Sequence, residues 1–198
     1  DIEQKGSDAL AWMERHGGNF LDTWSVGWHS ILDWIDDKLG KIAGYLHDIG
    51  NVVNRVDHSQ SGAVMAFRIL DRMDFPPMEI AQIVSAIGNH DEGTGVPVNA
   101  VAAALIIADK SDVRRSRVRN RDEQTFDIHD RVNYSVTESS LTINEMHSEI
   151  TLSLTIDTTI SSVMEYFEIF MKRMLMCCKA AEKLGLAFAL VVNGQQVL

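Results

Sequence analysis

Apolar residues in the first half of the chain recur every three or four positions, which is the spacing of one face of an α-helix. The runs are Trp28, Ile31, Leu32, Ile35 and Leu39, followed later by Ile80, Ile83, Val84 and Ile87. Glycines and prolines separate these runs, with a break expected at Gly40. The resulting segments lie near residues 28–39, 41–48, 58–73, 78–90 and 98–113. We therefore expect a mainly α protein built on a helical bundle.

The pattern changes after residue 133. Apolar and polar residues alternate over 141–143 and 150–156, which predicts a β-hairpin. Ser162 and Glu165 have the spacing of a capping box that opens an apolar helix, which is expected to end at Gly185. Residues 186–192 then resemble a strand. The sequence thus predicts a small C-terminal β-β-α-β appendage.

The length and composition favour one core with an elaboration. The chain has 198 residues, of which 45% are hydrophobic. We expect an N-terminal segment over 1–27, a helical domain over 28–132 and an α+β appendage over 133–198 that packs on it. Charges interrupt every long apolar stretch and no secretion signal begins the chain, so no membrane partner and a cytoplasmic location are expected. Cys177 and Cys178 are expected to be reduced and buried.

The net charge is −10, which argues against binding to a nucleic-acid polymer. One segment departs from this balance and carries six of the 18 basic residues: Lys110, Arg114, Arg115, Arg117, Arg119 and Arg121. Such a concentration could bind a small phosphorylated ligand. A solvated helix face is the alternative interpretation.

Ionisable residues stand at the ends of the predicted helices. His47 and Asp48 close one segment, His58 begins another, His90 follows Ile87 by three positions, and Asp109 follows an apolar face by four. A single inward histidine is more often a hydrogen-bonded core residue. Several such groups together would be costly to bury, and one divalent cation can compensate all of them. Imidazole with carboxylate suits Mn, Fe, Zn or Ni, and Mg is a further candidate for a centre of one or two ions.

These residues carry a resemblance to a known family. Tyr45-Leu46-His47-Asp48-Ile49-Gly50, with a later helix that ends Ala108-Asp109-Lys110, resembles the HD-domain metal-dependent phosphohydrolases over roughly residues 28–120. The histidines in Asp57-His58-Ser59-Gln60-Ser61-Gly62-Ala63 and Ala86-Ile87-Gly88-Asn89-His90-Asp91 are similar to those of the dinuclear branch, which includes bacterial HD hydrolases of dinucleoside tetraphosphates.

The resemblance implies roles for these residues. His47, Asp48 and Asp109 would bind a first metal, Asp48 could bridge, and His58 and His90 would bind a second. The family also has a histidine upstream of the His-Asp pair. His29, 18 positions before His47 (47 − 29 = 18), is preferred over His16.

The expected reaction is hydrolysis of a phosphoester or phosphoanhydride by metal-activated water, with a nucleotide as the expected substrate. Lys110 and Arg114 could bind phosphate oxygens, with Arg115 and Arg117 as further candidates, and Asp91 could assist proton transfer.

Two alternatives remain. One is a cyclic-dinucleotide phosphodiesterase, although Asn51 replaces the Lys of that subgroup and its Gly-Tyr-Pro signature is missing from the sequence. The other is a regulatory module that binds a nucleotide without cleaving it. The Met-rich helix over 162–184 is expected to be buried against the hairpin or against a second subunit, which would make a homodimer.

Overall fold

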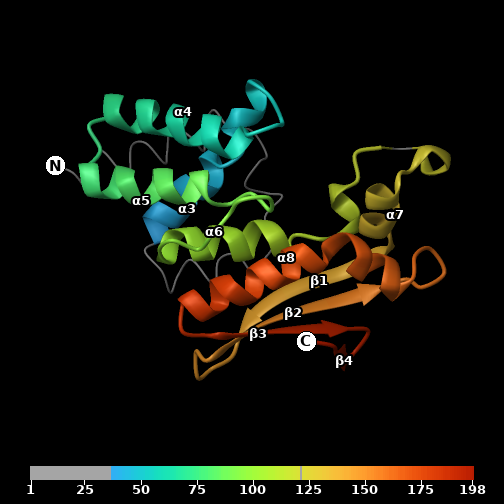
Figure 1. Cartoon of the computed structure of the whole chain (residues 1–198). Helices are drawn as coiled ribbons and strands as arrows, with labels where there is room; N and C mark the ends of the chain where they lie inside the picture. Colours follow the sequence, from blue (N-terminus) through green and yellow to red (C-terminus); the bar gives the residue numbers. More distant parts are fainter. Residues whose placement is uncertain (1–36, 121) are drawn as a thin grey trace. The chain divides into compact units, whose positions relative to one another are not determined.

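The computed structural model describes residues 37–120 and 122–198 (Figure 1). The chain divides between Asp109 and Lys110 into two compact units. The described part of the first unit is helical, and the second combines helices with a four-stranded sheet. This confirms the expected mainly α class with a small C-terminal β-β-α-β appendage.

The first unit consists of four described helices and one short 3-10 turn. They are α3 (Asp37–Leu46), η2 (Ile49–Val52), α4 (His58–Arg72), α5 (Pro77–Gly88) and α6 (Ala100–Ser111). Helix α5 contacts both α3 and α4, and Figure 1 shows α4 and α5 side by side. Helix α5 opens with a proline in its first turn, where the missing backbone N–H costs nothing.

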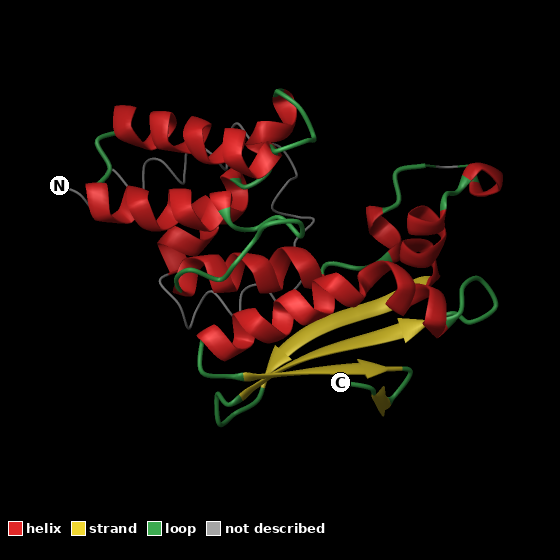
Figure 2. Ribbon diagram, in the orientation of Figure 1, coloured by secondary structure: helices red, strands yellow, loops and turns green. Residues whose placement is uncertain are grey.

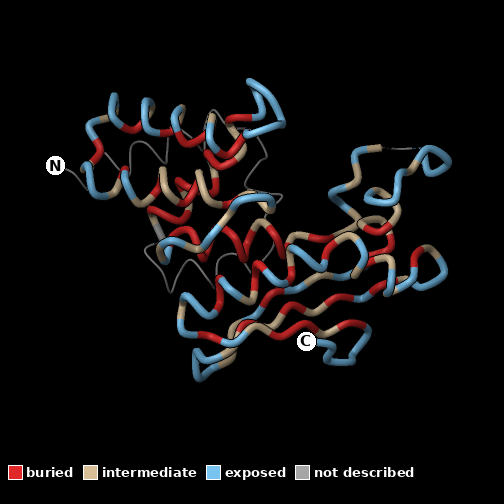
Figure 3. Tube along the Cα trace, viewed as in Figure 1, coloured by how far each residue is buried: buried red, intermediate tan, exposed pale blue. Residues whose placement is uncertain are grey.

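The core of this unit is formed by the apolar faces predicted from the sequence. Ile42 and Ala43 of α3, Leu70 of α4 and Ile83 of α5 are fully buried. In α6 every residue from 101 to 108 is buried, which Figure 3 shows as an unbroken red segment. Burial of this apolar surface is the main favourable contribution to folding.

One predicted helix boundary is wrong. Gly40 was expected to separate two helices, but α3 runs through it from Asp37 to Leu46. A glycine inside a helix costs about 1 kcal/mol relative to alanine. Burial of Leu39, Ile42 and Leu46 on the same helix outweighs that cost. The segment predicted over 28–39 falls largely outside the described residues.

The second unit contains a sheet and one long helix. Its elements are η3 (Arg115–Arg117), η4 (Glu123–Thr125), α7 (Ile128–Ser135), β1 (Val136–Ile143), β2 (Glu149–Ile156), α8 (Val163–Lys183), β3 (Ala187–Val192) and β4 (Gln195–Gln196). The strand order is β1-β2-β3-β4, and only the β2–β3 pair is parallel. Helix α8 provides the crossover between these two strands, contacts both, and runs along one face of the sheet in Figure 2.

The predicted hairpin is present, but its first strand is longer than expected. Strand β1 begins at Val136, and Leu141 pairs with Leu152 of β2. Residues 137–140 are polar and the register shifts between Val136 and Glu138, so this half of the strand has no regular alternation. In β2 the alternation is regular, with Ile150, Leu152, Leu154 and Ile156 buried.

Helix α8 begins and ends with the capping groups that the sequence predicts. Ser162 and Glu165 form a reciprocal capping box. At the other end, Gly185 has a φ of 75°, and Leu186 donates to the Ala181 carbonyl at 2.9 Å, as in a Schellman motif. None of the described helices, α8 included, is sufficiently long and apolar to cross a membrane.

Burial of α8 is less complete than its composition suggested. Met174 and Met176 are buried, but Met164 and Met171 are exposed. The two cysteines are free thiols; Cys177 is buried as predicted, whereas Cys178 is only partly buried. Partial burial raises the pKa of the Cys178 thiol.

Candidate metal centre

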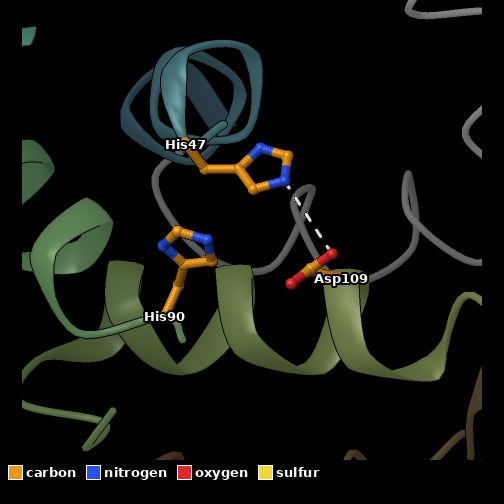
Figure 4. Close-up of side chains that lie close together, drawn as sticks. All are labelled: His47, His90 and Asp109. Atoms are coloured by element: carbon orange, nitrogen blue, oxygen red, sulfur yellow. Dashed lines mark ion pairs between the residues drawn. The ribbon is translucent and has the colours of Figure 1, made fainter. Parts of the chain in front are cut away.

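Five ionisable side chains in the first unit come together from the ends of different helices. His47 follows α3, Asp48 precedes η2, His58 is the first residue of α4, His90 follows α5, and Asp109 lies in the last turn of α6. Helix ends have unpaired backbone groups and leave side chains free to project past the helix. Figure 4 shows His47, His90 and Asp109 directed toward one another.

The three imidazoles are buried and the two carboxylates are less so. The exposed fractions are 3% for His47, 4% for His58 and 1% for His90. The side chains of Asp48 and Asp109 are 40% and 16% exposed. Burying several polar rings in one place is unfavourable unless a partner compensates them. The imidazoles are thus shielded from solvent. The exposed side of Asp48 leaves access to the cluster for a ligand from solvent.

Each imidazole is oriented by the backbone in the same way. The Nδ1 atom of His47 lies 2.6 Å from the Gly44 carbonyl, that of His58 lies 3.0 Å from the Arg55 carbonyl, and that of His90 lies 2.6 Å from the Ile87 carbonyl. A carbonyl oxygen only accepts, so Nδ1 must donate and carries the hydrogen in all three rings. In the neutral rings, Nε2 therefore holds the lone pair, which is the arrangement of a metal ligand.

His58 and His90 meet through these Nε2 atoms. The two nitrogens are 3.2 Å apart, and the ring planes are nearly perpendicular at 81°. Because both hydrogens are on Nδ1, two neutral rings would direct lone pairs at each other. A cation that accepts both lone pairs removes this repulsion. Asp48 completes the group, with its Oδ1 atom 3.2 Å from Nε2 of His58 and 3.9 Å from Nε2 of His90.

A second group of possible ligands shares His90. It consists of His47, His90 and Asp109, and Nε2 of His47 lies 3.8 Å from Oδ1 of Asp109 (Figure 4). In each of the two groups the ligand atoms lie within 4.8 Å of one another. Ligands about 2.1 Å from an ion are separated by at most about 4.2 Å, so small side-chain adjustments suffice in either group.

Close backbone packing holds the Asp48 turn against the start of α4. A Cβ atom added at Gly50 would lie 1.9 Å from the His58 carbonyl oxygen and 2.6 Å from the Gly62 nitrogen. A Cβ at Gly62 would lie 3.2 Å from the His47 carbonyl oxygen. At Gly50 only glycine allows this approach, and at Gly62 a side chain would make a tight contact. The two glycines thus position His47 and Asp48 beside His58.

The structure brings together most of the residues expected at the site, but groups them differently. The sequence assigned His90 to the second metal alone, whereas it belongs to both groups. Asp48 lies with His58 and His90, and its Oδ2 atom is also 3.5 Å from Nε2 of His47. His29 and its alternative His16 lie outside the described residues, so the upstream ligand stays a prediction.

Asp91 belongs to neither group of possible ligands in the described chain. Its Oδ2 atom accepts a hydrogen bond from the Gly93 backbone at 3.2 Å, and its carbonyl accepts from Gly95 at 2.7 Å. These bonds stabilise the turn after α5. The suggested part of Asp91 in proton transfer remains a prediction.

The basic segment does not form the solvated helix face that was the alternative interpretation of the sequence. Helix α6 ends at Ser111, and Arg115 to Arg117 form a short 3-10 turn of the second unit. Lys110 is buried in the last turn of α6. Substrate binding by this segment remains a prediction.

Three arginines of the segment have partners in the second unit. The guanidinium groups of Arg114 and Arg117 both contact Asp112, at 2.8 and 2.9 Å. Arg115 donates to the Tyr134 carbonyl at 2.6 Å and stacks on the Tyr134 ring. Contacts of this kind are common in structural turns and by themselves indicate no ligand.

Arg55 is a neighbour of the centre that the sequence patterns do not indicate. It lies on the loop between Asp48 and His58, and its Nη1 atom is 3.9 Å from Oδ1 of Asp48. Its carbonyl is the acceptor for His58 described above. The sequence feature that could have indicated Arg55 is its position between His47 and His58. Helical periodicity gives no indication there, because it stops at Leu46 and resumes at His58.

Comparison with known proteins supplies one match. The family model described as HD domain matches residues 25–134, which is more than half of the 198-residue chain. The match includes all five residues of the cluster and continues into the second unit. No curated protein and no solved structure matches the chain.

Proposed function

The chain belongs to the HD domain family, a superfamily of metal-dependent phosphohydrolases, and from this premise we propose that it hydrolyses a phosphoester or phosphoanhydride bond in a nucleotide. The observation that carries the proposal is the approach of the His58 and His90 Nε2 atoms to 3.2 Å, with Asp48 beside them. Two lone pairs and a carboxylate at one point form a cation site.

The donor set fits a transition metal. HD domains bind divalent ions, and the ligands here would be His47, His58 and His90 with Asp48 and Asp109. Three imidazole nitrogens favour Mn, Fe, Zn or Ni over Mg, which prefers oxygen ligands and retains its water. The two groups share His90, whose Nδ1 hydrogen is directed to the Ile87 carbonyl, so its one Nε2 lone pair would bind a single ion. In a centre of two ions, as in the dinuclear branch of the family, His90 would belong to one ion only and the remaining ligands would hold the other.

A bound divalent ion supplies a water of lowered pKa and a Lewis acid for a phosphoryl oxygen. The contribution of the protein is positioning. The backbone carbonyls at Gly44, Arg55 and Ile87 fix the ring orientations before substrate arrives. The exposed side of Asp48 leaves an open approach for a phosphoryl group, and the buried histidines exclude water from the other side.

Exposed apolar residues near the centre support a nucleotide as the substrate. Val52, Val53 and Val56 lie on the loop whose two ends carry Asp48 and His58, and all three are exposed. Val96 and Val98, on the segment that follows His90, are also exposed. An apolar edge beside a phosphate site can contact a nucleobase while the metal centre takes the phosphate.

The test combines metal analysis with an activity screen. The purified chain, supplemented with Mn²⁺ or Zn²⁺, is assayed on nucleoside monophosphates, cyclic di-GMP and dinucleoside tetraphosphates. His47→Ala and Asp48→Ala should lose metal and hydrolysis together. His129→Ala, an exposed histidine of the second unit, is the matched control. If His47→Ala and Asp48→Ala cleave these compounds as fast as wild type, the proposed function is wrong.

The screen also separates the alternatives. Turnover of cyclic di-GMP alone would favour the cyclic-dinucleotide phosphodiesterase. Nucleotide binding without bound metal or metal-stimulated turnover would favour the regulatory module.

A further inference from the structure

The loop between Asp48 and His58 connects two residues of the candidate centre, and backbone hydrogen bonds fix the loop at both of its ends. Its first part forms η2, in which Asn51 donates to the Asp48 carbonyl at 3.0 Å and Val53 donates to the Gly50 carbonyl at 2.9 Å. At its other end, Gln60 and Ser61 donate to the Asp57 carbonyl at 3.1 Å. The loop is therefore a defined turn, and side chains on it have fixed starting points.

Arg55 occupies this loop and has two different relationships with the centre. Its backbone carbonyl accepts the Nδ1 hydrogen of His58 at 3.0 Å. Its side chain is 74% exposed, and its guanidinium lies 3.9 Å from Oδ1 of Asp48 and donates to the Asn51 side chain at 3.4 Å. The backbone of Arg55 thus orients a ligand, while its charged group stands at the open side of the centre.

The ion pair with Asp48 does not explain this position. An arginine with so much exposure gains little from a carboxylate at that distance, because solvent screens the attraction. The remaining N–H groups of Arg55 have no acceptor among the described residues. A guanidinium presents several parallel N–H donors, and a phosphoryl group offers matching oxygens.

Metal binding strengthens the case for an anion. A divalent ion held by Asp48 would lie close to the Arg55 guanidinium, and the two positive charges repel each other. An anion that bridges the ion and the guanidinium removes the repulsion and gains from both charges. No other arginine or lysine side chain of the described chain forms an ion pair with Asp48.

We propose that Arg55 is a substrate-binding residue that holds a non-bridging oxygen of the phosphoryl group at the metal centre. The inference rests on the proposed function, because it takes the cluster as the place where the phosphoryl group binds. It adds a residue from the loop itself to the expected phosphate contacts, which the sequence places only in the basic segment that begins at Lys110.

The experiment measures binding rather than turnover. Phenylphosphonate, which carries a phosphoryl group that this reaction cannot cleave, is titrated into the Mn²⁺-loaded full chain by calorimetry. Arg55→Ala should weaken binding by about tenfold or more, since a charge-assisted hydrogen bond to the phosphoryl group is lost. Arg55→Lys, which keeps the positive charge but loses the planar array of N–H donors, should give an intermediate affinity for phenylphosphonate.

Two controls separate substrate binding from a structural role. Arg68→Ala removes another exposed arginine of the first unit, ten residues along α4 from His58, and should bind phenylphosphonate like wild type. The Mn²⁺ content of Arg55→Ala should equal or exceed that of wild type, because a positive neighbour of the ion is removed. Loss of metal in Arg55→Ala would overturn the proposal and make Arg55 a support for Asp48.

Results that rule out Arg55 as a phosphoryl-binding residue can be distinguished from results that rule out the proposed function. If Arg55→Ala binds phenylphosphonate as tightly as wild type, or if the metal-loaded wild type does not bind it at all, Arg55 does not hold the phosphoryl group. Hydrolysis by the wild type in the substrate screen would leave the proposed function standing in either case.

Discussion

The Nε2 atoms of His58 and His90 lie 3.2 Å apart, while the Nδ1 atom of each ring is hydrogen-bonded to the backbone carbonyl three residues earlier. The backbone thus determines which nitrogen faces the neighbouring ring. Two imidazoles arranged in this way are a poor pair without a cation between them and a good pair of ligands with one.

The shared position of His90 predicts an order among the histidine variants. His90→Ala removes a ligand from both groups, whereas His58→Ala removes a ligand from one. We expect His90→Ala to lower metal affinity by about a hundredfold or more and His58→Ala to retain part of the bound metal. Metal content after gel filtration, measured by mass spectrometry, gives the comparison, with His129→Ala as control. Equal metal content in His90→Ala and wild type would contradict this prediction.

Removal of metal should lower thermal stability. A ligand that binds only the folded state stabilises it by about 2.7 kcal/mol at a hundred times its dissociation constant. We expect EDTA to lower the unfolding midpoint of the wild type and Mn²⁺ or Zn²⁺ to restore it. Asp48→Ala should show a much smaller difference between these conditions. A wild-type midpoint that responds to neither EDTA nor metal would mean that no folded-state ion is bound.

Gly50 should tolerate no side chain. An added Cβ would lie 1.9 Å from the His58 carbonyl oxygen, so Gly50→Ala must displace η2 from α4. Overpacking of this kind costs about 1–3 kcal/mol in unfolding free energy and should also reduce metal binding. Chemical denaturation measures the first effect.

The matched control for Gly50 is Gly88→Ala. Its Cβ would meet the Ala63 Cβ at 3.6 Å, an ordinary contact, so little loss of stability is expected. Equal stability of Gly50→Ala and Gly88→Ala would show that the close approach is not required.

The capping box of α8 should give a small pH dependence. Hydrogen bonds from the Ser162 backbone and the Ser161 hydroxyl lower the pKa of Glu165 below its usual value of 4.5. Because the folded-state pKa is lowered, the stabilisation is present above pH 4.5 and is lost as the pH falls through the folded-state value. Unfolding midpoints between about pH 6 and 3 should fall less steeply in Glu165→Gln than in wild type. Parallel curves would contradict the prediction.

Much of the site could be predicted because helical spacing projects residues onto known faces. His90 was placed three positions after Ile87, and Asp109 four after Leu105, so both were expected at inward helix ends, where the structure has them. The capping box and Gly185 likewise determined the limits of α8. These features depend on neighbours within a few residues along the chain.

The features that were missed depend on tertiary packing or on loop conformation. Gly40 was expected to end a helix, and buried neighbours on α3 overcame its low propensity. The helix predicted over 98–113 ends at Ser111, so the helix face that was the alternative for the basic segment is not formed. Arg55 reaches Asp48 because of the turn of a loop, and the sharing of His90 between two groups follows from the packing of helix ends; no periodic pattern encodes either.

The most direct test of the central claim is anomalous diffraction from crystals of the Mn²⁺- or Zn²⁺-loaded protein at the absorption edge of the metal. A metal ion held by the cluster should give a peak within about 2.0–2.4 Å of Nε2 of both His58 and His90 and of a carboxylate oxygen of Asp48. A crystal in which those two nitrogens remain in direct contact with no anomalous peak between them, in the presence of saturating metal, would contradict it.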